Sequence, residues 1–317
     1  MNYATTGTVL FAGTTADIVV PASQTASAFA LLHFAKPPGC WTPAHRHRRE
    51  DETVYVLSGS LRAETEDCAD DLAPGEALVL PRDRPHRLGN TGAGEARFLV
   101  LCTPGGFDSF VHEAGRPFPA GDRAVAEDDA ARLMAAAPHY GIELLPLDAL
   151  RPVHAGRAKV APEATDVLGV TVEILAEVGP EEDDLCLIRG SLPPGGVVPL
   201  HSHADRETLY GLSGTMEVSV GPVGAGSWHT VATGDVVDIP SGVPHALRNR
   251  GEVAADSLLV TTRRIAELFR EVGCPTNAVL PGPPSPARLN AFVVALRARG
   301  FWLANPEGSV VLSSQPG

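Results

Sequence analysis

Several features are scarce in this 317-residue sequence, and each absence argues against a class of protein. No stretch approaches 18 uninterrupted apolar residues, so we expect no membrane-spanning helix. The N-terminus shows no basic segment followed by an apolar one, which argues against a secretory signal peptide. The five cysteines are scattered and form no C-x-x-C pair, so they do not predict a disulfide framework. We therefore expect a reducing compartment and a cytoplasmic protein.

Positive charge is also scarce. The chain has 25 Lys and Arg against 38 Asp and Glu, a formal net charge of −13, and its only lysines are Lys36 and Lys159. Nucleic acids and anionic membranes attract proteins with a surplus of cations, so we expect neither as a partner. What is present is apolar material: 44% of the residues are hydrophobic, enough to form globular cores.

Turn-forming residues are plentiful, with 32 Gly and 28 Pro and no collagen period. This richness favours short strands joined by turns over long helices. Runs rich in β-branched and aromatic residues support strands at 52–64, 76–83 and 96–103, and again at 207–220, 235–242 and 256–263. The regular helices of a parallel βαβ fold are missing between them.

The strand pattern occurs twice. AHRHRREDETVYVLSGSL (44–61) resembles LHSHADRETLYGLSGTM (200–216), and PGEALVLPRDRPHRLGNTG (74–92) resembles TGDVVDIPSGVPHALRNRG (233–251). A third pair, 103–117 and 261–275, follows in the same order, and the offset stays between 155 and 159 residues. A constant offset over three blocks indicates a duplicated domain.

We therefore predict an all-β fold of two tandem barrels, each with short trailing helices. The domains are expected at 1–150 and 167–317, with a linker at 151–166 that lacks apolar periodicity. Helices are expected at 126–140, after acidic capping residues, and at 285–300, which begins with Ser-Pro and ends with Gly.

Histidines and glutamates fall at matching places in the two copies. Alternate residues of a strand share a face, so the two histidines of each H-x-H project together. A glutamate four or five residues later and a third histidine from another strand can join them. Three imidazoles and one carboxylate suit a divalent ion such as iron, manganese, nickel, copper or zinc. The two predicted metal sets are His45, His47, Glu52 and His86, and His201, His203, Glu207 and His245.

These spacings resemble the two motifs of the cupin superfamily, G-x5-H-x-H-x3–4-E-x6-G and G-x5-P-x-G-x2-H-x3-N. The second copy matches both without a departure. The first has Asp83 where the family has Gly, and we expect only a local change because Asp tolerates many turn conformations. The resemblance is to two-domain members, the bicupins, and implies a jelly-roll barrel around each metal.

Each copy further resembles the quercetin 2,3-dioxygenase-like cupins through 103–115 and 141–146. This resemblance implies an Fe(II)-dependent dioxygenase with dioxygen and a small aromatic or enolic substrate, with up to two metal ions per chain. Glu52 or Glu207 would remain a ligand or take a proton from the substrate.

Other functions stay open, because this fold carries many activities. One alternative is an oxygen-independent isomerase, cyclase or decarboxylase, and another is a small-molecule-binding protein without turnover. A homodimer also stays open.

Residues around the metal sets allow further expectations. Strand parity places Trp41 on the face of His45, which predicts a bulkier, more aromatic first pocket unless Trp41 packs the barrel mouth. The arginines at 46, 48 and 49 are expected to pair with Glu50 and Asp51 as a solvated rim. Asn90 and Asn249 are expected to be structural hydrogen-bonding groups.

Overall fold

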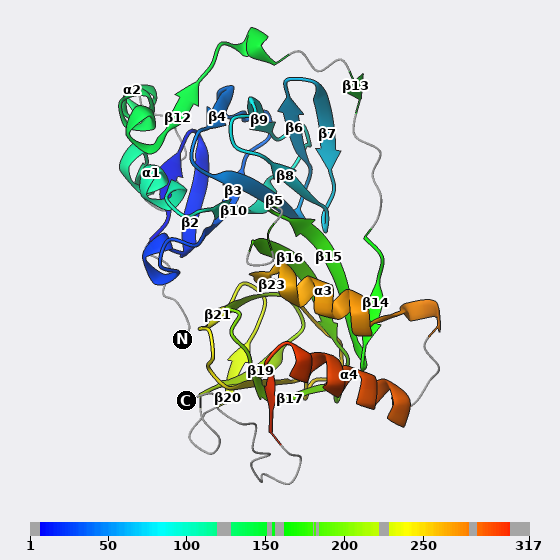
Figure 1. The fold of residues 1–317 in the computed structure, drawn as a ribbon. Coiled ribbons are helices and arrows are strands. Elements are labelled where there is room, and N and C mark those ends of the chain that lie inside the picture. Colours follow the sequence, from blue (N-terminus) through cyan, green and yellow to red (C-terminus); the bar gives the residue numbers. More distant parts are fainter. Residues whose placement is uncertain are drawn as a thin grey trace. The chain divides into compact units, whose positions relative to one another are not determined.

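The computed structural model describes residues 7–118, 128–150, 154–155, 162–179, 181, 184–221, 228–278 and 284–304. They form two compact units, one within 3–160 and the other within 161–317 (Figure 1). Each unit is mostly β and contains two sheets, the jelly-roll arrangement expected from the sequence.

The first unit holds a seven-stranded and a six-stranded sheet. In spatial order the larger sheet consists of β11 (Arg116–Pro117), β1 (Val9–Phe11), β2 (Thr14–Val20), β3 (Ala30–Lys36), β10 (Ala96–Thr103), β5 (Asp51–Ser58) and β8 (Ala77–Leu80). The smaller sheet consists of β12 (Ile142–Leu144), β4 (His45–His47), β9 (His86–Gly89), β6 (Leu61–Thr65), β7 (Cys68–Leu72) and β13 (His154–Ala155).

The second unit repeats this plan with a seven-stranded and a five-stranded sheet. The larger sheet consists of β21 (Val236–Ile239), β18 (Glu207–Ser213), β23 (Ala255–Thr262), β16 (Leu185–Leu192), β15 (Val170–Glu177), β14 (Thr165–Val167) and β24 (Cys274–Pro275). The smaller sheet consists of β20 (Trp228–Val231), β19 (Met216–Val220), β22 (His245–Arg248), β17 (Val197–Ser202) and β25 (Trp302–Leu303).

Two helices follow the last long strand of each unit. The helices are α1 (Phe107–Ala114) and α2 (Asp129–Ala136) in the first unit, and α3 (Arg263–Val272) and α4 (Pro286–Ala298) in the second. Short 3-10 helices are η1 (Ala22–Gln24), η2 (Ala137–Tyr140), η3 (Leu147–Ala149) and η4 (Thr276–Ala278). Within the described ranges, no helix is long and apolar enough to cross a membrane.

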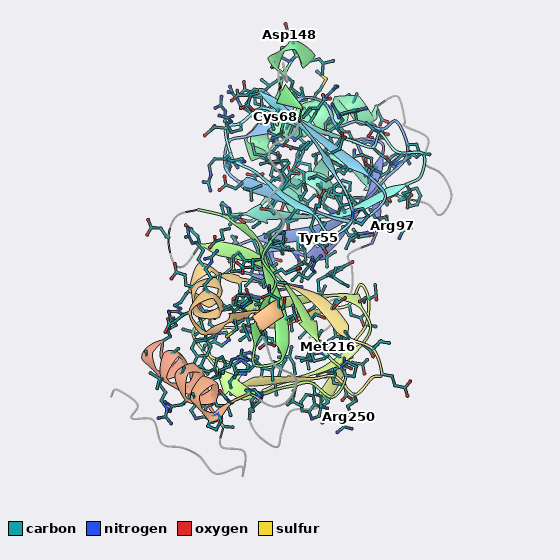
Figure 2. All side chains as sticks on the ribbon, turned by 90° about the vertical axis from the view of Figure 1, so that its right-hand side faces the viewer. Tyr55, Cys68, Arg97, Asp148, Met216 and Arg250 are labelled. Atoms are coloured by element: carbon teal, nitrogen blue, oxygen red, sulfur yellow. The ribbon has the colours of Figure 1, made fainter. Side chains whose placement is uncertain are left out.

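Alternation along the strands builds the two cores. In β6 the residues Leu61, Ala63 and Thr65 are buried while those between them are half-exposed, so one face points inward. In the second unit, Met216 of β19 is 3% exposed and lies among the sheet side chains, whereas Arg250 projects outward (Figure 2). Apolar burial of this kind supplies the main driving force for folding.

The two units match bond for bond at the end of the strand that carries the third histidine. The amide nitrogen Nδ2 of Asn90 donates to the carbonyl oxygens of Lys36 and Gly94, each at 2.8 Å. In the other unit Nδ2 of Asn249 donates to the carbonyl oxygens of Leu192 and Val253, also at 2.8 Å. The structural role expected for both asparagines is thus confirmed, and Lys36 and Leu192 occupy equivalent positions.

Most expected elements are present, with two additions. The predicted strands 52–64 and 207–220 each divide at their Ser-Gly into two strands. Helix α4 begins after Ser285, whose hydroxyl oxygen accepts from the Arg288 amide, with Pro286 as its first residue. Of the predicted helix 126–140, residues 126 and 127 lie outside the described residues, and the rest forms α2 and η2. Helices α1 and α3 were not expected from the sequence, although their segments also repeat.

The domain limits 1–150 and 167–317 stay predictions. Within the expected linker 151–166, His154–Ala155 pairs in parallel with the start of β7, and Thr165 already belongs to β14. The described parts of this segment therefore extend the sheets of the units on either side.

Candidate metal centres and the cavity beside them

In the first unit, neighbouring strands bring the predicted donors together. β4 carries His45 and His47, which share a face, and His45 lies opposite His86 of β9 in the register of the smaller sheet. Glu52 comes from β5 of the facing sheet. One donor atom from each of these four residues lies within 4.8 Å of the others, and all four side chains are buried.

The second unit gathers the equivalent residues in nearly the same way. Donor atoms of His201, His203 and His245 lie within 4.8 Å of one another. The carboxylate of Glu207 lies against two of them, with oxygen-to-Nε2 distances of 3.3 Å to His203 and 3.4 Å to His245. All eight predicted ligand positions thus meet in two clusters, one per unit.

The hydrogen bonds of the ring nitrogens test whether a metal fits. Nδ1 of His45 lies 2.9 Å from the carbonyl oxygen of Pro43, and Nδ1 of His86 lies 3.0 Å from that of Arg84. Nδ1 of His201 and of His245 face the carbonyl oxygens two residues before them, at 2.8 and 2.9 Å. A carbonyl can only accept, so in these rings Nδ1 carries the hydrogen and Nε2 keeps its lone pair.

Four Nε2 atoms of the two clusters are buried without a hydrogen-bond partner, and two of them belong to the rings just described. The Nε2 atoms of His47, His86, His203 and His245 are inaccessible to solvent and make no well-aligned hydrogen bond. Buried polar atoms without partners are rare in proteins because they cost free energy. Convergent imidazole lone pairs beside a carboxylate fit a divalent transition-metal ion in each unit.

Two acidic residues that the sequence analysis did not assign to the sites orient the middle histidines. Oε1 of Glu50 lies 3.1 Å from Nδ1 of His47, and the Glu50 side chain is buried. In the second unit Oδ2 of Asp205 lies 3.4 Å from Nδ1 of His203, and Arg264 pairs with Asp205 at 2.9 Å. Such partners fix the ring and raise its basicity toward a metal. The signal was an acidic residue two or three positions after each H-x-H.

Equivalent histidines of the two clusters have pKa values shifted in the same direction. Burial opposes a proton on His47, but the carboxylates of Glu50 and Glu52 outweigh it and raise the pKa of His47 to about 9. Burial and the neighbouring imidazole His86 lower the pKa of His45 well below its usual value. In the second unit the same causes raise the pKa of His203 to about 9 and lower that of His201 to about 4.

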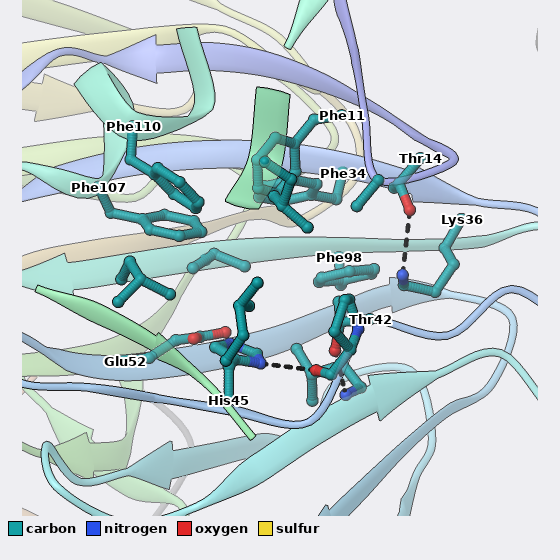
Figure 3. A pocket seen from close by; sticks show the side chains of 17 residues that line it. Phe11, Thr14, Phe34, Lys36, Thr42, His45, Glu52, Phe98, Phe107 and Phe110 are labelled. Atoms are coloured by element: carbon teal, nitrogen blue, oxygen red, sulfur yellow. Dashed lines mark hydrogen bonds between the residues drawn. The ribbon is translucent and has the colours of Figure 1, made fainter. Parts of the chain in front are cut away.

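A cavity of about 580 Å³, counting open solvent at its mouth, reaches the first metal set (Figure 3). His45 and Glu52 form part of its wall. Five of the other 15 lining residues are phenylalanines: Phe11, Phe34, Phe98, Phe107 and Phe110. Leu133 of α2 and Ile142 and Leu144 of β12 also line it, so the helix and strand after the barrel help to enclose the site.

The expectation of an aromatic first pocket holds, but its source was misassigned. Trp41 is not among the lining residues; it packs over Gly89, where a Cβ atom would lie 2.3 Å from its ring. Arg87 stacks on the outer side of the same indole, 4.1 Å from the ring centroid. Trp41 thus packs between Gly89 and Arg87, and the phenylalanines, which the analysis did not single out, form the pocket.

The rim arginines pair with other partners than expected. Arg46 and Arg48 both bind Glu143 of β12, and Arg48 also binds Asp83 at 2.8 Å. Of the expected partners, Glu50 faces His47 and Asp51 pairs with Arg82. The expected pairing was wrong because local sequence proximity does not reveal which strand β4 pairs with.

Asp83, the single departure from the motif, keeps the local fold. Its φ is +64°, close to the +76° of Gly242 at the equivalent position. The backbone nitrogens of both residues donate to the carbonyl oxygen of the second histidine, at 2.7 Å in each unit. Asp tolerates this left-handed conformation better than most residues, so the expectation of a local change is confirmed.

Comparison with known proteins agrees with this fold and site. Residues 32–102 and 189–261 each match the sequence model of the cupin domain family. Bacillus subtilis oxalate decarboxylase, a protein with Mn(II) centres, aligns with a TM-score of 0.57 and 20% identity over 83% of this chain and 77% of that one. The Lactobacillus farciminis oxalate decarboxylase formate complex aligns with a TM-score of 0.54 and 17% identity, covering 83% of each chain.

Two curated sequences from Streptomyces also match. Protein SchB of Streptomyces halstedii is 37% identical over 67 residues, which are 21% of this chain and 49% of SchB. The tetracenomycin polyketide synthase protein TcmJ of Streptomyces glaucescens is 30% identical over 92 residues, 29% of this chain and 62% of TcmJ. The matches thus span less than two thirds of either relative.

Two jelly-roll barrels, each with a buried histidine and glutamate cluster suited to a metal, define the class of this protein. The two matching segments give the family: the chain is a bicupin of the cupin superfamily.

Proposed function

We propose that this bicupin is a metal-dependent enzyme whose first barrel acts on an aromatic, enolisable carbonyl compound by proton transfer, without dioxygen. The observation that carries the proposal is the apolar cavity walled at one place by His45 and Glu52. A largely apolar pocket with a few convergent polar groups is typical of a small-molecule site. One relative, TcmJ, is by name a tetracenomycin polyketide synthase protein, which is consistent with such a substrate.

The cavity also argues for the kind of substrate. One lysine and no arginine line it, while 12 of its 17 lining residues are apolar and five of these are phenylalanines. A small dianion such as oxalate would leave the phenylalanine rings uncovered, whereas a flat aromatic body would replace water against them. The similarity to oxalate decarboxylases is therefore a similarity of fold.

The chain's own residues suit proton transfer. His45, His47, Glu52 and His86 would hold the metal, which when bound supplies a Lewis acid for the substrate carbonyl. Glu52 is the acid–base residue: its carboxylate faces the cavity and can take a proton from the carbon beside the carbonyl and return it elsewhere. The surrounding phenylalanines exclude water and hold the ring in place. Isomerisation and cyclisation both begin in this way.

Exchange of hydrogen for deuterium tests this directly. We expect the metal-loaded chain to exchange the methyl protons of 4-hydroxyacetophenone in anaerobic D2O, as followed by proton NMR. Glu52→Gln should lower the exchange rate by ~100-fold or more, the usual contribution of a general base. Glu207→Gln is the matched control and should leave the rate unchanged. Exchange that is equal in both variants and wild type would refute the role of Glu52.

An Fe(II) dioxygenase is the second candidate, because an apolar cavity beside three histidines and one glutamate also suits dioxygen. Quercetin is the probe, with an oxygen electrode and product analysis as the assay. Iron-dependent oxygen uptake with ring cleavage would favour this candidate. Elemental analysis of the purified chain identifies the metal, since manganese, nickel, copper and zinc fit the same donors.

A further inference from the structure

Lys36 is a buried charged residue that the metal chemistry does not use. It ends β3, is 1% exposed and lines the cavity of the first unit. Its Nζ donates to Oγ1 of Thr14 at 3.0 Å, and Sγ of Cys40 lies 3.9 Å away. Figure 3 shows Lys36 and Thr14 facing each other on one side of the cavity, with His45 and Glu52 on another. The cavity therefore has two polar groups of side chains, Lys36 with Thr14 and His45 with Glu52, and aromatic rings lie between them.

In the part of the chain that the structure describes, no carboxylate lies within ion-pair distance of this ammonium group, and Glu52, on another side of the cavity, acts on it only at longer range. Burying an unpaired charge is costly, and burial accordingly lowers the pKa of Lys36. A lysine has three donors, and the hydroxyl of Thr14 takes one of them. An anionic group entering the cavity would supply the ammonium with an ion-pair partner and with further hydrogen-bond acceptors.

The second barrel shows that the fold does not require these polar residues. Lys36 corresponds to Leu192, because the two asparagines bind their carbonyl oxygens in the same way. Thr14 corresponds to Val170, since each begins the second strand of the equivalent hairpin, opposite Phe11 and Val167.

Cys40 likewise corresponds to Gly196, because each gives its carbonyl oxygen to the backbone nitrogen of the equivalent asparagine. All three polar side chains are therefore replaced together by apolar residues in the second copy. A structural need would hold for both barrels, so Lys36 and Thr14 serve the cavity that they line.

We propose that Lys36, oriented by Thr14, is an anion-binding subsite that takes the carboxylate of an aromatic ligand in the first barrel. The aromatic body lies among the phenylalanines, and its other polar end reaches the metal set. The inference rests on the proposed function in placing the ligand in this cavity. It adds the requirement that the substrate class carries a carboxylate, which forms a charge-assisted hydrogen bond with the ammonium.

Binding of benzoate and benzamide, which share a shape but differ in charge, tests the subsite by isothermal titration calorimetry on the full chain. We expect wild type to prefer benzoate by ~10-fold or more, the typical value of a hydrogen bond to a charged group. Lys36→Leu, which installs the residue of the second barrel, should abolish the preference. Thr14→Val should weaken it. His86→Ala should keep it, because that change disturbs the metal set alone.

Each outcome decides for or against the subsite. A preference that persists in Lys36→Leu and disappears in His86→Ala would assign anion binding to the metal and overturn the proposal. Equal binding of the two ligands to wild type, or no saturable binding of benzoate, would overturn it as well. If Lys36→Leu does not fold, Lys36→Gln, which keeps the length and loses the charge, takes its place. No turnover is measured, so failure of the proposed reaction leaves this test intact.

Discussion

Replacing Asn90 or Asn249 by alanine should destabilise the two barrels by the same amount. Each asparagine lies just after the strand that carries the third histidine, and each is at most 1% exposed. Besides its two donated bonds, each side chain accepts one from a backbone nitrogen, that of Gly92 at 2.9 Å or Gly251 at 2.8 Å. One alanine substitution thus removes three hydrogen bonds and leaves buried backbone groups without partners.

The structure sets the size of this effect. Three bonds worth about 1 kcal/mol each give about 3 kcal/mol, and the carbonyl oxygens left without partners raise the loss toward about 5 kcal/mol. With a urea slope of about 1–3 kcal/mol per molar, the unfolding midpoint of the affected barrel should fall by at least about 1 M. This is a large share of the stability of a single domain, typically about 5–15 kcal/mol.

Urea unfolding followed by tryptophan fluorescence and circular dichroism is the assay. Trp41 reports on the first barrel, and Trp228 and Trp302 on the second, so each variant should shift its own transition. Asn277→Ala, at an exposed site of η4, is the control and should change stability by no more than about 0.5 kcal/mol. If both buried variants behave like this control, the reasoning from duplicated hydrogen bonds is wrong.

Three further predictions concern the metal and the buried lysine. Wild type should bind about two equivalents of divalent metal, and His86→Ala and His245→Ala should each lose about one, as measured by elemental analysis; variants that retain wild-type metal would reject the ligand sets. Because a metal must displace the proton held by His47 and His203, whose pKa values are raised to about 9, affinity should rise ~10-fold per pH unit up to about pH 9. Competition with a chelator measures this slope, and a flat profile contradicts it. The lowered pKa of Lys36 means that the unfolded chain binds more protons, so wild-type stability rises with pH up to the unfolded value near 10.5. Lys36→Leu should therefore stabilise the chain by about 1–3 kcal/mol at pH 7, a gain that shrinks toward pH 10.5 in thermal melts; a gain that does not depend on pH would refute a burial cost of charge.

Most of the correct predictions from the sequence, of strands and of metal ligands, depended on the internal repeat. Local periodicity marked the strands, and the H-x-H pattern indicated which side chains share a face, because strand alternation is a short-range property. A second copy then served as an internal check at every motif position. The departure at Asp83 was interpretable for the same reason, since a turn conformation depends on a few neighbouring residues.

What the sequence did not reveal depends on pairing between distant segments. The five phenylalanines of the cavity come from β1, β3, β10 and α1, and no local pattern shows that they face one another. Glu143 was not recognised as the partner of Arg46 because β12 joins β4 only in the folded barrel. Lys36 gave no signal beyond its rarity, since its burial depends on Thr14 and the surrounding sheet.

The strand pairs that hold the first two histidines of each metal set form at different times during synthesis of the chain. β4 pairs with β12 at 142–144, and β17 pairs with β25 at 302–303, so in each unit a strand that follows the helices extends the sheet of the first two histidines. During synthesis the first barrel can close and load its ion before the second is finished. A chain ending before residue 301 would keep all four donors of the second set yet leave the edge of β17 unpaired, so such a truncation should impair metal retention in that barrel alone.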